Sequence, residues 1–387
     1  MGGSSKRATL VKRAGLGLLA VALLVIPLFS SDFTMTMIIR YMYYGLLTIS
    51  FGFLAGELGL FSLMTPVSLT LTGYTIGLCQ TKFDIPFIPS IFLAFLVSMS
   101  FAALCGWMAD RSQGVSFLML TLVFSQLVYS LALQWTSMTN GTTGLLGIRF
   151  PDALEIFSEN TKVNHYYWTL LIFGLTIFLV YRLITSSYGL RLRGIKNSET
   201  RMAALGYHTG LLKWSAFMVS SLISSIAGVL FVYNTGMINP EIMTLNSSNQ
   251  ALISSILGGV DSVLLGSIVG TVINRTLELT LGSLTRRYAT IVGALFLAII
   301  LLMPEGLISI AKKLVYGKDG RPGRPVGGTV QGQSAEAGDG AGGTGAGLRC
   351  VTPGGSPEEA LASGGPGDVV SSNDTEGTEE KGGKMRR

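Results

Sequence analysis

Residues 194–233 read GIKNSETRMAALGYHTGLLKWSAFMVSSLISSIAGVLFVY. The first part, 194–210, is polar and basic, whereas 213–233 carries no charge beyond its first residue and is rich in apolar side chains. A helix needs about 20 apolar residues to cross a hydrocarbon layer ~30 Å thick. The second part therefore predicts a membrane-spanning helix, and the first predicts a polar connection at one of its ends.

The composition of the whole chain leads to the same class of protein. Of its 387 residues, 49% are hydrophobic and 13% are charged, and the mean hydropathy is +0.52. Such a chain is too apolar for an ordinary soluble domain and indicates an integral membrane protein. The three cysteines, Cys79, Cys105 and Cys350, follow no spacing typical of a disulfide framework or a metal site.

Further apolar runs predict an all-α fold, a polytopic transmembrane helical bundle of about 8–10 spanning helices. A tract at 249–281 is interrupted by glycines and can count as two passes. The other runs lie at 14–31, 35–54, 58–79, 86–109, 115–135, 166–184, 213–233 and 289–311. The first follows a basic head and resembles a signal peptide, but no small-x-small cleavage site follows it, which favours a first transmembrane helix.

The lysines and arginines predict how the bundle is oriented, because cytoplasmic loops are enriched in them. Residues 1–317 hold 20 basic and 12 acidic residues. The basic ones gather before the first helix, after the sixth and after the last, so an even number of passes places both termini in the cytoplasm. Arg286 and Arg287 fall outside by this count, against the positive-inside rule. The connection at 136–165 then lies outside, where it can contact an extracytoplasmic partner or serve as a solvated connector.

The composition changes at about residue 317. Residues 1–316 form the predicted transmembrane domain, with a cytoplasmic loop at about 185–213. Residues 317–387 are rich in Gly, Ser and acidic side chains and hold few large apolar ones. Such a segment cannot offset the entropy cost of ordering, so we expect a disordered cytoplasmic tail.

Motifs for covalent chemistry are missing from the sequence. It contains no GxxxxGK[ST] phosphate-binding loop, no His/Cys cluster with metal-ligand spacing, and only two histidines, His165 and His208. We therefore expect no catalytic residue, no metal and no cofactor in this chain. Uphill transport would draw its energy from a partner or from an ion gradient.

The polar stretch contains the start and stop signals of a short helix. Asn197 or Ser198 can cap its first turn, Glu199 complements the helix dipole there, and Gly206 provides a stop. The body, 199–205, places Met202 and Leu205 on one face. Two turns are marginal alone, so this helix either rests on the bilayer surface or inserts into a cytoplasmic partner whose movement it transmits.

A family resemblance favours the second alternative. The segment SSYGLRLRGIKNSETRMAALGYHTGLLKWSAFMVSSLISSIAGVLF (186–231) resembles the signature loop and following helix of permeases of branched-chain amino acid type ABC importers. Three more segments resemble that family: FLMLTLVFSQLVYSLALQW with TNGTTGLLGI, ILGGVDSVLLGSIVGTVI, and LLMPEGL. The resemblance covers about 114–310, whereas 56–77 departs from the family pattern, lacking its Ser and His.

The resemblance implies a transport subunit without a catalytic site of its own. In such importers two cytoplasmic ATPases bind ATP-Mg and dock on an EAA…G loop, echoed here by Glu199, Ala203, Ala204 and Gly206. A second permease would complete the pathway, an extracytoplasmic binding protein would deliver the solute, and the chain would lie in the bacterial inner membrane. The solute would be a branched-chain amino acid, or alternatively urea or a short-chain amide. The implied coupling residues are Glu199, Arg201, Met202, Ala203, Ala204, Leu205 and Gly206.

Two other segments are candidates for the translocation pathway. Asn140, Gly141, Thr142, Thr143 and Gly144 follow a predicted helix and either line the path or form an ordinary tight turn. Gly258, Gly259 and Asp261 interrupt the 249–281 tract. They mark either a discontinuous helix beside the path or small residues that allow close helix packing.

Two other classes of function stay open from the sequence. A stand-alone ion-coupled transporter would need core carboxylates, for which Glu57, Asp261 and Glu278 are the candidates. Arg275 and Glu278, three residues apart, more simply neutralise each other. A non-transporting scaffold working through its tail has no supporting feature beyond the tail's length.

Overall fold

The computed structural model describes residues 27, 31–109, 112, 114–150, 161–259, 262–284 and 293–294. All of them belong to the first of two units, 1–322 and 323–387. Most of the predicted first helix (14–31), most of the last (289–311) and the whole predicted tail (317–387) lie outside the described residues. So do Asp261 and residues 151–160 of the predicted external loop.

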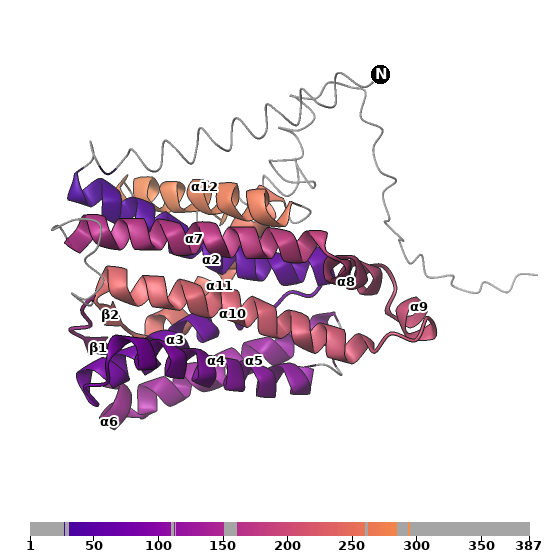
Figure 1. Ribbon diagram of the computed structural model, residues 1–387, viewed down its shortest axis with the longest axis horizontal. Helices are drawn as coiled ribbons and strands as arrows, with labels where there is room; N and C mark the ends of the chain where they lie inside the picture. Colours follow the sequence, from indigo (N-terminus) through magenta and orange to yellow (C-terminus); the bar gives the residue numbers. More distant parts are fainter. Residues whose placement is uncertain are drawn as a thin grey trace, which may run out of the picture. The chain divides into compact units, whose positions relative to one another are not determined.

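Six helices within the described part of the chain are long and apolar enough to cross a membrane. This confirms a polytopic helical membrane protein, with six of the expected eight to ten spans lying among described residues. The spans are α2 (Asp32–Phe53, continued by the π-helical turn η1, Leu54–Leu58), α4 (Phe87–Ala109), α5 (Val115–Gln134), α7 (Thr161–Thr185), α10 (Thr209–Thr235) and α12 (Val263–Leu284) (Figure 1).

Shorter elements fill the space between the spans. They are α3 (Thr65–Thr81), α6 (Thr136–Thr139), α8 (Ser187–Asn197), α9 (Glu199–Ala204), the 3-10 turn η3 (Pro240–Met243) and α11 (Leu245–Gly258). A small antiparallel pair, β1 (Leu145–Leu146) and β2 (Met237–Ile238), matches Leu145 with Ile238. No pattern in the sequence predicted these two strands. They lie at one end of the bundle, and α8 and α9 lie at the other (Figure 1).

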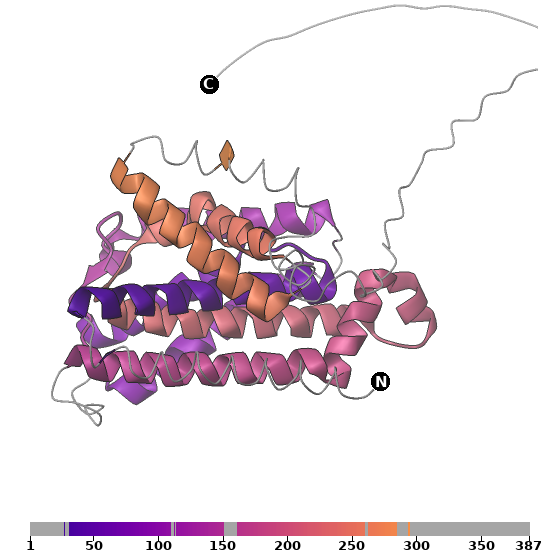
Figure 2. The same ribbon diagram turned by 90° about the horizontal axis from the view of Figure 1, so that it is seen from above.

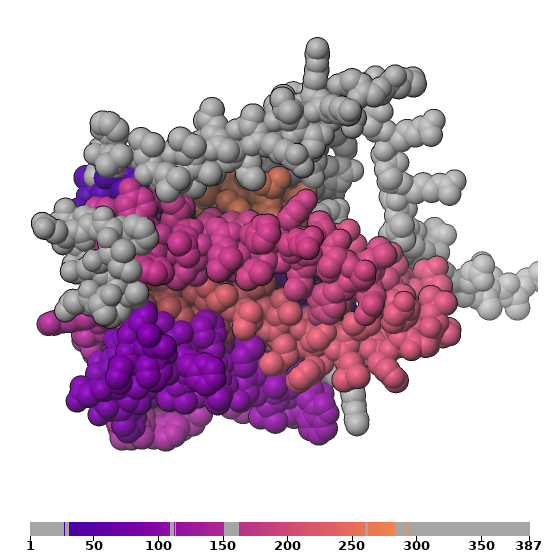
Figure 3. All heavy atoms as spheres, in the orientation of Figure 1, coloured from indigo at the N-terminus to yellow at the C-terminus, as the bar shows by residue number. Residues whose placement is uncertain are grey.

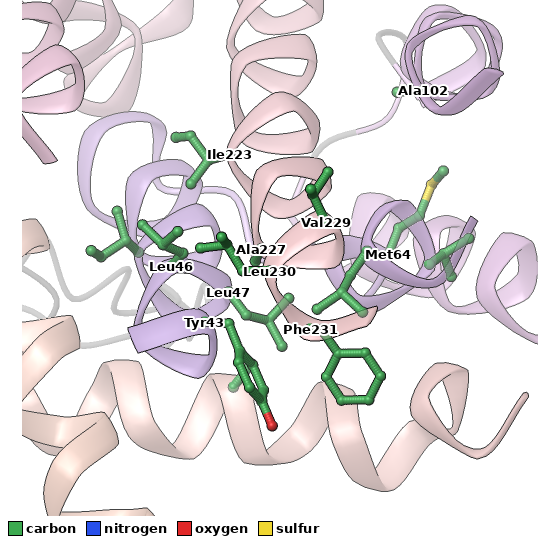
Figure 4. Close-up of a cluster of buried hydrophobic side chains, with 14 of the residues drawn as sticks. Tyr43, Leu46, Leu47, Met64, Ala102, Ile223, Ala227, Val229, Leu230 and Phe231 are labelled. Carbon is green, nitrogen blue, oxygen red and sulfur yellow. The ribbon is translucent and has the colours of Figure 1, made fainter. Parts of the chain in front are cut away.

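The centre of the bundle is formed by α2 and α10. Tyr43 and Leu47 of α2 lie beside Phe231 of α10 (Figure 4), with the two aromatic rings edge to face at 5.2 Å. Small side chains let the helices approach. Ser50 and Ser220 exchange hydrogen bonds across the α2–α10 contact, and their hydroxyl oxygens lie 2.9 Å apart. In a membrane, where lipid is as apolar as leucine, such close packing and interhelical hydrogen bonds hold helices together.

The segment predicted as a spanning helix at 58–79 is shorter than expected. α3 begins only at Thr65 and has 17 residues, while 59–64 is not helical. Gly59 adopts a left-handed conformation (φ +74°), which ends η1. Pro66 lies in the first turn of α3, where its missing N–H and fixed φ are tolerated. The apolar composition of the run did not reveal this break.

The glycine-interrupted tract forms two helices that pack backbone to backbone. α11 has 14 residues, too few to cross the ~30 Å hydrocarbon layer. A Cβ on Gly258 would lie 1.8 Å from the Gly266 carbonyl oxygen, and one on Gly270 would lie 1.9 Å from that of Ser254. α12 then crosses α2 obliquely (Figure 2), where Thr271 donates a hydrogen bond to Thr48. The tract is therefore both discontinuous and packed through small residues.

Candidate coupling site and pathway residues

The predicted short helix is present and has both of its caps. α9 runs from Glu199 to Ala204, and the Ser198 hydroxyl accepts a hydrogen bond from the Arg201 N–H (3.4 Å). Gly206 adopts φ +85°, and the N–H groups of Gly206 and Tyr207 donate to the carbonyls of Ala203 and Met202 (2.9 and 3.2 Å). This is a Schellman motif, which requires a left-handed residue and so favours glycine. Of the two predicted capping residues, Ser198 is the one used.

An ion pair fastens α9 to α10. The Glu199 carboxylate lies 2.5 Å from the ammonium group of Lys213, whose side chain is only 7% exposed. A lysine so deeply buried requires a partner, because an uncompensated charge away from water is costly. Glu199, predicted as a helix-dipole residue, therefore also holds α9 against the first turns of α10.

The exposed surface of α9 differs from the predicted one. Met202 does not share an outward face with Leu205: it packs inward, and a Cβ on Gly194 of α8 would lie 2.7 Å from its sulfur. Leu205 is 72% exposed, and Arg201, Ala203, Ala204 and Gly206 are exposed beside it. The α8–α9 segment protrudes at its end of the bundle (Figure 3). The apolar knob therefore consists of Leu205 flanked by small residues, without Met202.

Contacts between α8 and η1 were missed by the sequence reasoning. Arg193 of α8 binds Glu57 of η1 through two hydrogen bonds, and Lys196 donates to the carbonyl of Gly56. Hydrogen bonding to Glu57 raises the pKa of Arg193 above its usual value. The one available signal was Glu57 itself, a lone carboxylate in an apolar segment.

The run 139–144 forms a tight turn at the end of the bundle opposite α9. Asn140, Gly141 and Gly144 all have positive φ, and a Cβ on Gly144 would lie 2.0 Å from the carbonyl oxygen of Ile238 in β2. Thr142 and Thr143 are exposed. Turn geometry and close backbone approach account for these residue types, and a role in the pathway stays a prediction.

Two further predicted pathway residues, Gly258 and Gly259, lie at the end of α11. Both are buried there, and Asp261 lies outside the described residues. Further along α12, Arg275 and Glu278 form the predicted ion pair at 2.5 Å. Arg275 also stacks 3.4 Å above the ring of Tyr44, and Gln250 of α11 donates to Glu278 (3.3 Å).

Of the three candidate carboxylates of an ion-coupled transporter, the structure describes Glu57 and Glu278, and an arginine pairs with each of them. Glu57 pairs with Arg193 and Glu278 with Arg275. Within the described ranges, no group of three or more His, Cys, Asp or Glu side chains could hold a metal ion. The geometry of these residues gives an ion-coupled mechanism no support.

Comparison with known proteins agrees with the sequence resemblance. The family model described as "Branched-chain amino acid transport system / permease component" matches residues 33–304. The chain is 26% identical over 313 residues to the high-affinity branched-chain amino acid transport system permease protein LivM of Salmonella typhimurium LT2, covering 74% of this chain and 72% of that protein.

Two further relatives extend the comparison. LivM of Escherichia coli K12 is 25% identical over 332 residues, covering 78% of this chain and 77% of the relative. The permease protein LivH of Salmonella typhimurium is 28% identical over 140 residues, covering 36% of this chain and 44% of LivH. No solved structure matches the chain.

Proposed function

The chain belongs to the permease component family of branched-chain amino acid transport systems, and from that premise we propose that it carries branched-chain amino acids across the bacterial inner membrane. It acts as the membrane-spanning subunit of an ATP-driven importer and has no catalytic site of its own. Energy comes from separate ATPase subunits that bind ATP-Mg. The solute named for the LivM and LivH relatives supports this substrate class over urea or short-chain amides.

The observation that carries the proposal is the construction of α9. A six-residue helix is unstable alone, yet this one has a capping serine, a Schellman stop and an ion pair to a buried lysine. These three interactions hold Leu205 in an exposed position. A short, capped helix that presents an exposed leucine is suited to insert into an apolar groove of an ATPase subunit.

The proposed orientation follows from the same element. With α9 in the cytoplasm, the basic α8–α9 segment obeys the positive-inside rule, and we keep the predicted cytoplasmic side for both termini. The end with β1, β2 and the 139–144 turn then faces outward, where an extracytoplasmic binding protein delivers the solute. A second permease completes the pathway.

The test compares Leu205→Asp with wild type in the complete importer, reconstituted with both permeases, the ATPases and the binding protein. We expect the substitution to leave the membrane subunit folded, because Leu205 is exposed, and to abolish copurification of the ATPases and leucine-stimulated ATP hydrolysis. The control is Leu146→Asp, an exposed leucine at the opposite end, which should keep the ATPases bound. Unchanged ATPase binding in Leu205→Asp would refute the docking role.

Substrate class is tested in the same vesicles. Uptake of labelled leucine should be competed by isoleucine and valine. Competition by urea or acetamide instead would favour the alternative substrate class. Leucine uptake that follows an ion gradient without ATP would overturn the importer mechanism itself.

A further inference from the structure

Glu57 is a buried carboxylate in an apolar part of the chain. Its side chain is 3% exposed, and it lies in η1, at the end of the central helix α2. Charged side chains at such positions are costly and persist where they are paired and useful. The partner of Glu57 therefore indicates what the charge does.

That partner comes from the segment that carries α9. Nε of Arg193 lies 2.7 Å from one carboxylate oxygen of Glu57, and a terminal guanidinium nitrogen lies 2.9 Å from the other. A bidentate pair of this kind fixes the relative orientation of two groups as well as their distance. Arg193 is 136 residues away in sequence, so the pair joins α8 to the end of α2.

Lys196 makes a second contact to the same turn. It is three residues after Arg193 and therefore on the same face of α8, and its ammonium group donates to the Gly56 carbonyl at 2.9 Å. Carbonyls in the last turn of a helix lack a partner within the helix. Lys196 satisfies one of them, so two adjacent residues of η1 are held by two side chains of α8.

The turn that is held has an unusual geometry. η1 is π-helical over five residues, and the left-handed Gly59 follows it. Single π-helical turns are frequent at functional sites, and they are places where a helix can kink. The contacts from α8 therefore fall on a point where α2 can bend.

We propose that Glu57, Arg193 and Lys196 form a brace that transmits movement of α9 to α2 through η1. The proposal rests on the proposed function, in which α9 is the element moved by the ATPases. When α9 moves, α10 moves with it through the Glu199–Lys213 pair. α2 moves with it through α8 and the brace. These two helices form the buried centre of the bundle, so one displacement reaches both. The three brace residues are positioning residues and do not touch the solute.

The test uses the complete importer in proteoliposomes with leucine as the probe. The main variant is Glu57→Gln/Arg193→Gln, which removes the pair without leaving a buried charge unpaired. The matched control is Asp32→Asn/Lys162→Gln, which removes the exposed ion pair between α2 and α7. Three quantities are measured: ATPase subunits bound, ATP hydrolysed, and leucine taken up per ATP.

We expect the main variant to keep its ATPases and to hydrolyse ATP, while leucine uptake per ATP falls about 2- to 30-fold, the range for mutations in coupling networks. The control should match wild type. Lys196→Gln changes an exposed side chain and is expected to fold even if the main variant does not. Lys196→Gln should also lower leucine uptake per ATP. Arg193→Lys, which keeps the positive charge but loses the planar guanidinium that binds both carboxylate oxygens, should lower it too.

The outcomes separate the two proposals. Wild-type uptake per ATP in both the main variant and Lys196→Gln, together with loss of ATPase binding in Leu205→Asp, would overturn the brace alone. Unchanged ATPase binding in Leu205→Asp would instead overturn the docking of ATPases on α9, and the brace would fall with it. An equal loss of uptake in the control pair would also refute the brace, since any ion pair on α2 would then have the same effect.

Discussion

The ion pair between Glu199 and Lys213 should show an asymmetric response to the loss of either partner. Glu199→Gln leaves the ammonium group of Lys213, a 7% exposed side chain, without a counter-charge. Removing one partner of a buried pair costs about 3–5 kcal/mol. Because the partner, Glu199, is 28% exposed and its site admits some water, we expect the lower end, about 3 kcal/mol. Lys213→Met keeps the aliphatic stem and leaves a carboxylate that water can reach, so about 1 kcal/mol or less is expected.

A double-mutant cycle separates the pair from the helix dipole. In the Lys213→Met background, Glu199→Gln should cost only about 0.3–1 kcal/mol, which is the dipole contribution at a helix N-terminus. The measurement is the free energy of unfolding of the four proteins in detergent micelles, followed by near-UV circular dichroism. Additive costs in the double variant would show that Lys213 does not depend on Glu199, and equal costs for the two single variants would contradict the expected asymmetry.

Three further outcomes follow from the geometry. Gly206→Val should destabilise the end of α9 by about 1–2 kcal/mol, because a β-branched residue is strained at φ +85°. The same variant should weaken ATPase binding, whereas Gly206→Asn should retain most of the ATPase binding. Gly258→Ala should lower the free energy of unfolding by about 1–3 kcal/mol, since its Cβ would meet only backbone atoms of Gly266. Gly174→Ala in α7, where no atom lies within 4 Å of the new Cβ, should be neutral or stabilise slightly; an equal loss for both alanines would contradict the packing argument.

Much of the bundle could be predicted because its signals are local. A run of apolar residues of the right length specifies a membrane helix wherever it lies, and five of the six described spans fell within a few residues of the predicted runs; the sixth, α12, is the second half of the interrupted tract. The caps of α9 are equally local, since Ser198 and Gly206 act on backbone groups within four residues of themselves. The Arg275–Glu278 pair is three residues apart and was expected for the same reason.

The sequence by itself thus determined that this chain is a membrane bundle with a short, capped helix on a basic connection, and its motifs indicated the family. Only the tertiary structure decided that Met202 packs inward while Leu205 stays exposed. It also decided that α3 begins only at Thr65 and that Glu57 forms an ion pair with Arg193. The physical reason is the distance along the chain over which each kind of interaction acts. Hydropathy and caps depend on neighbours along the chain, whereas the partner of a buried charge, or the atoms that a glycine must clear, are fixed by how separate elements pack together. Glu57 and Arg193, for example, are 136 residues apart in sequence.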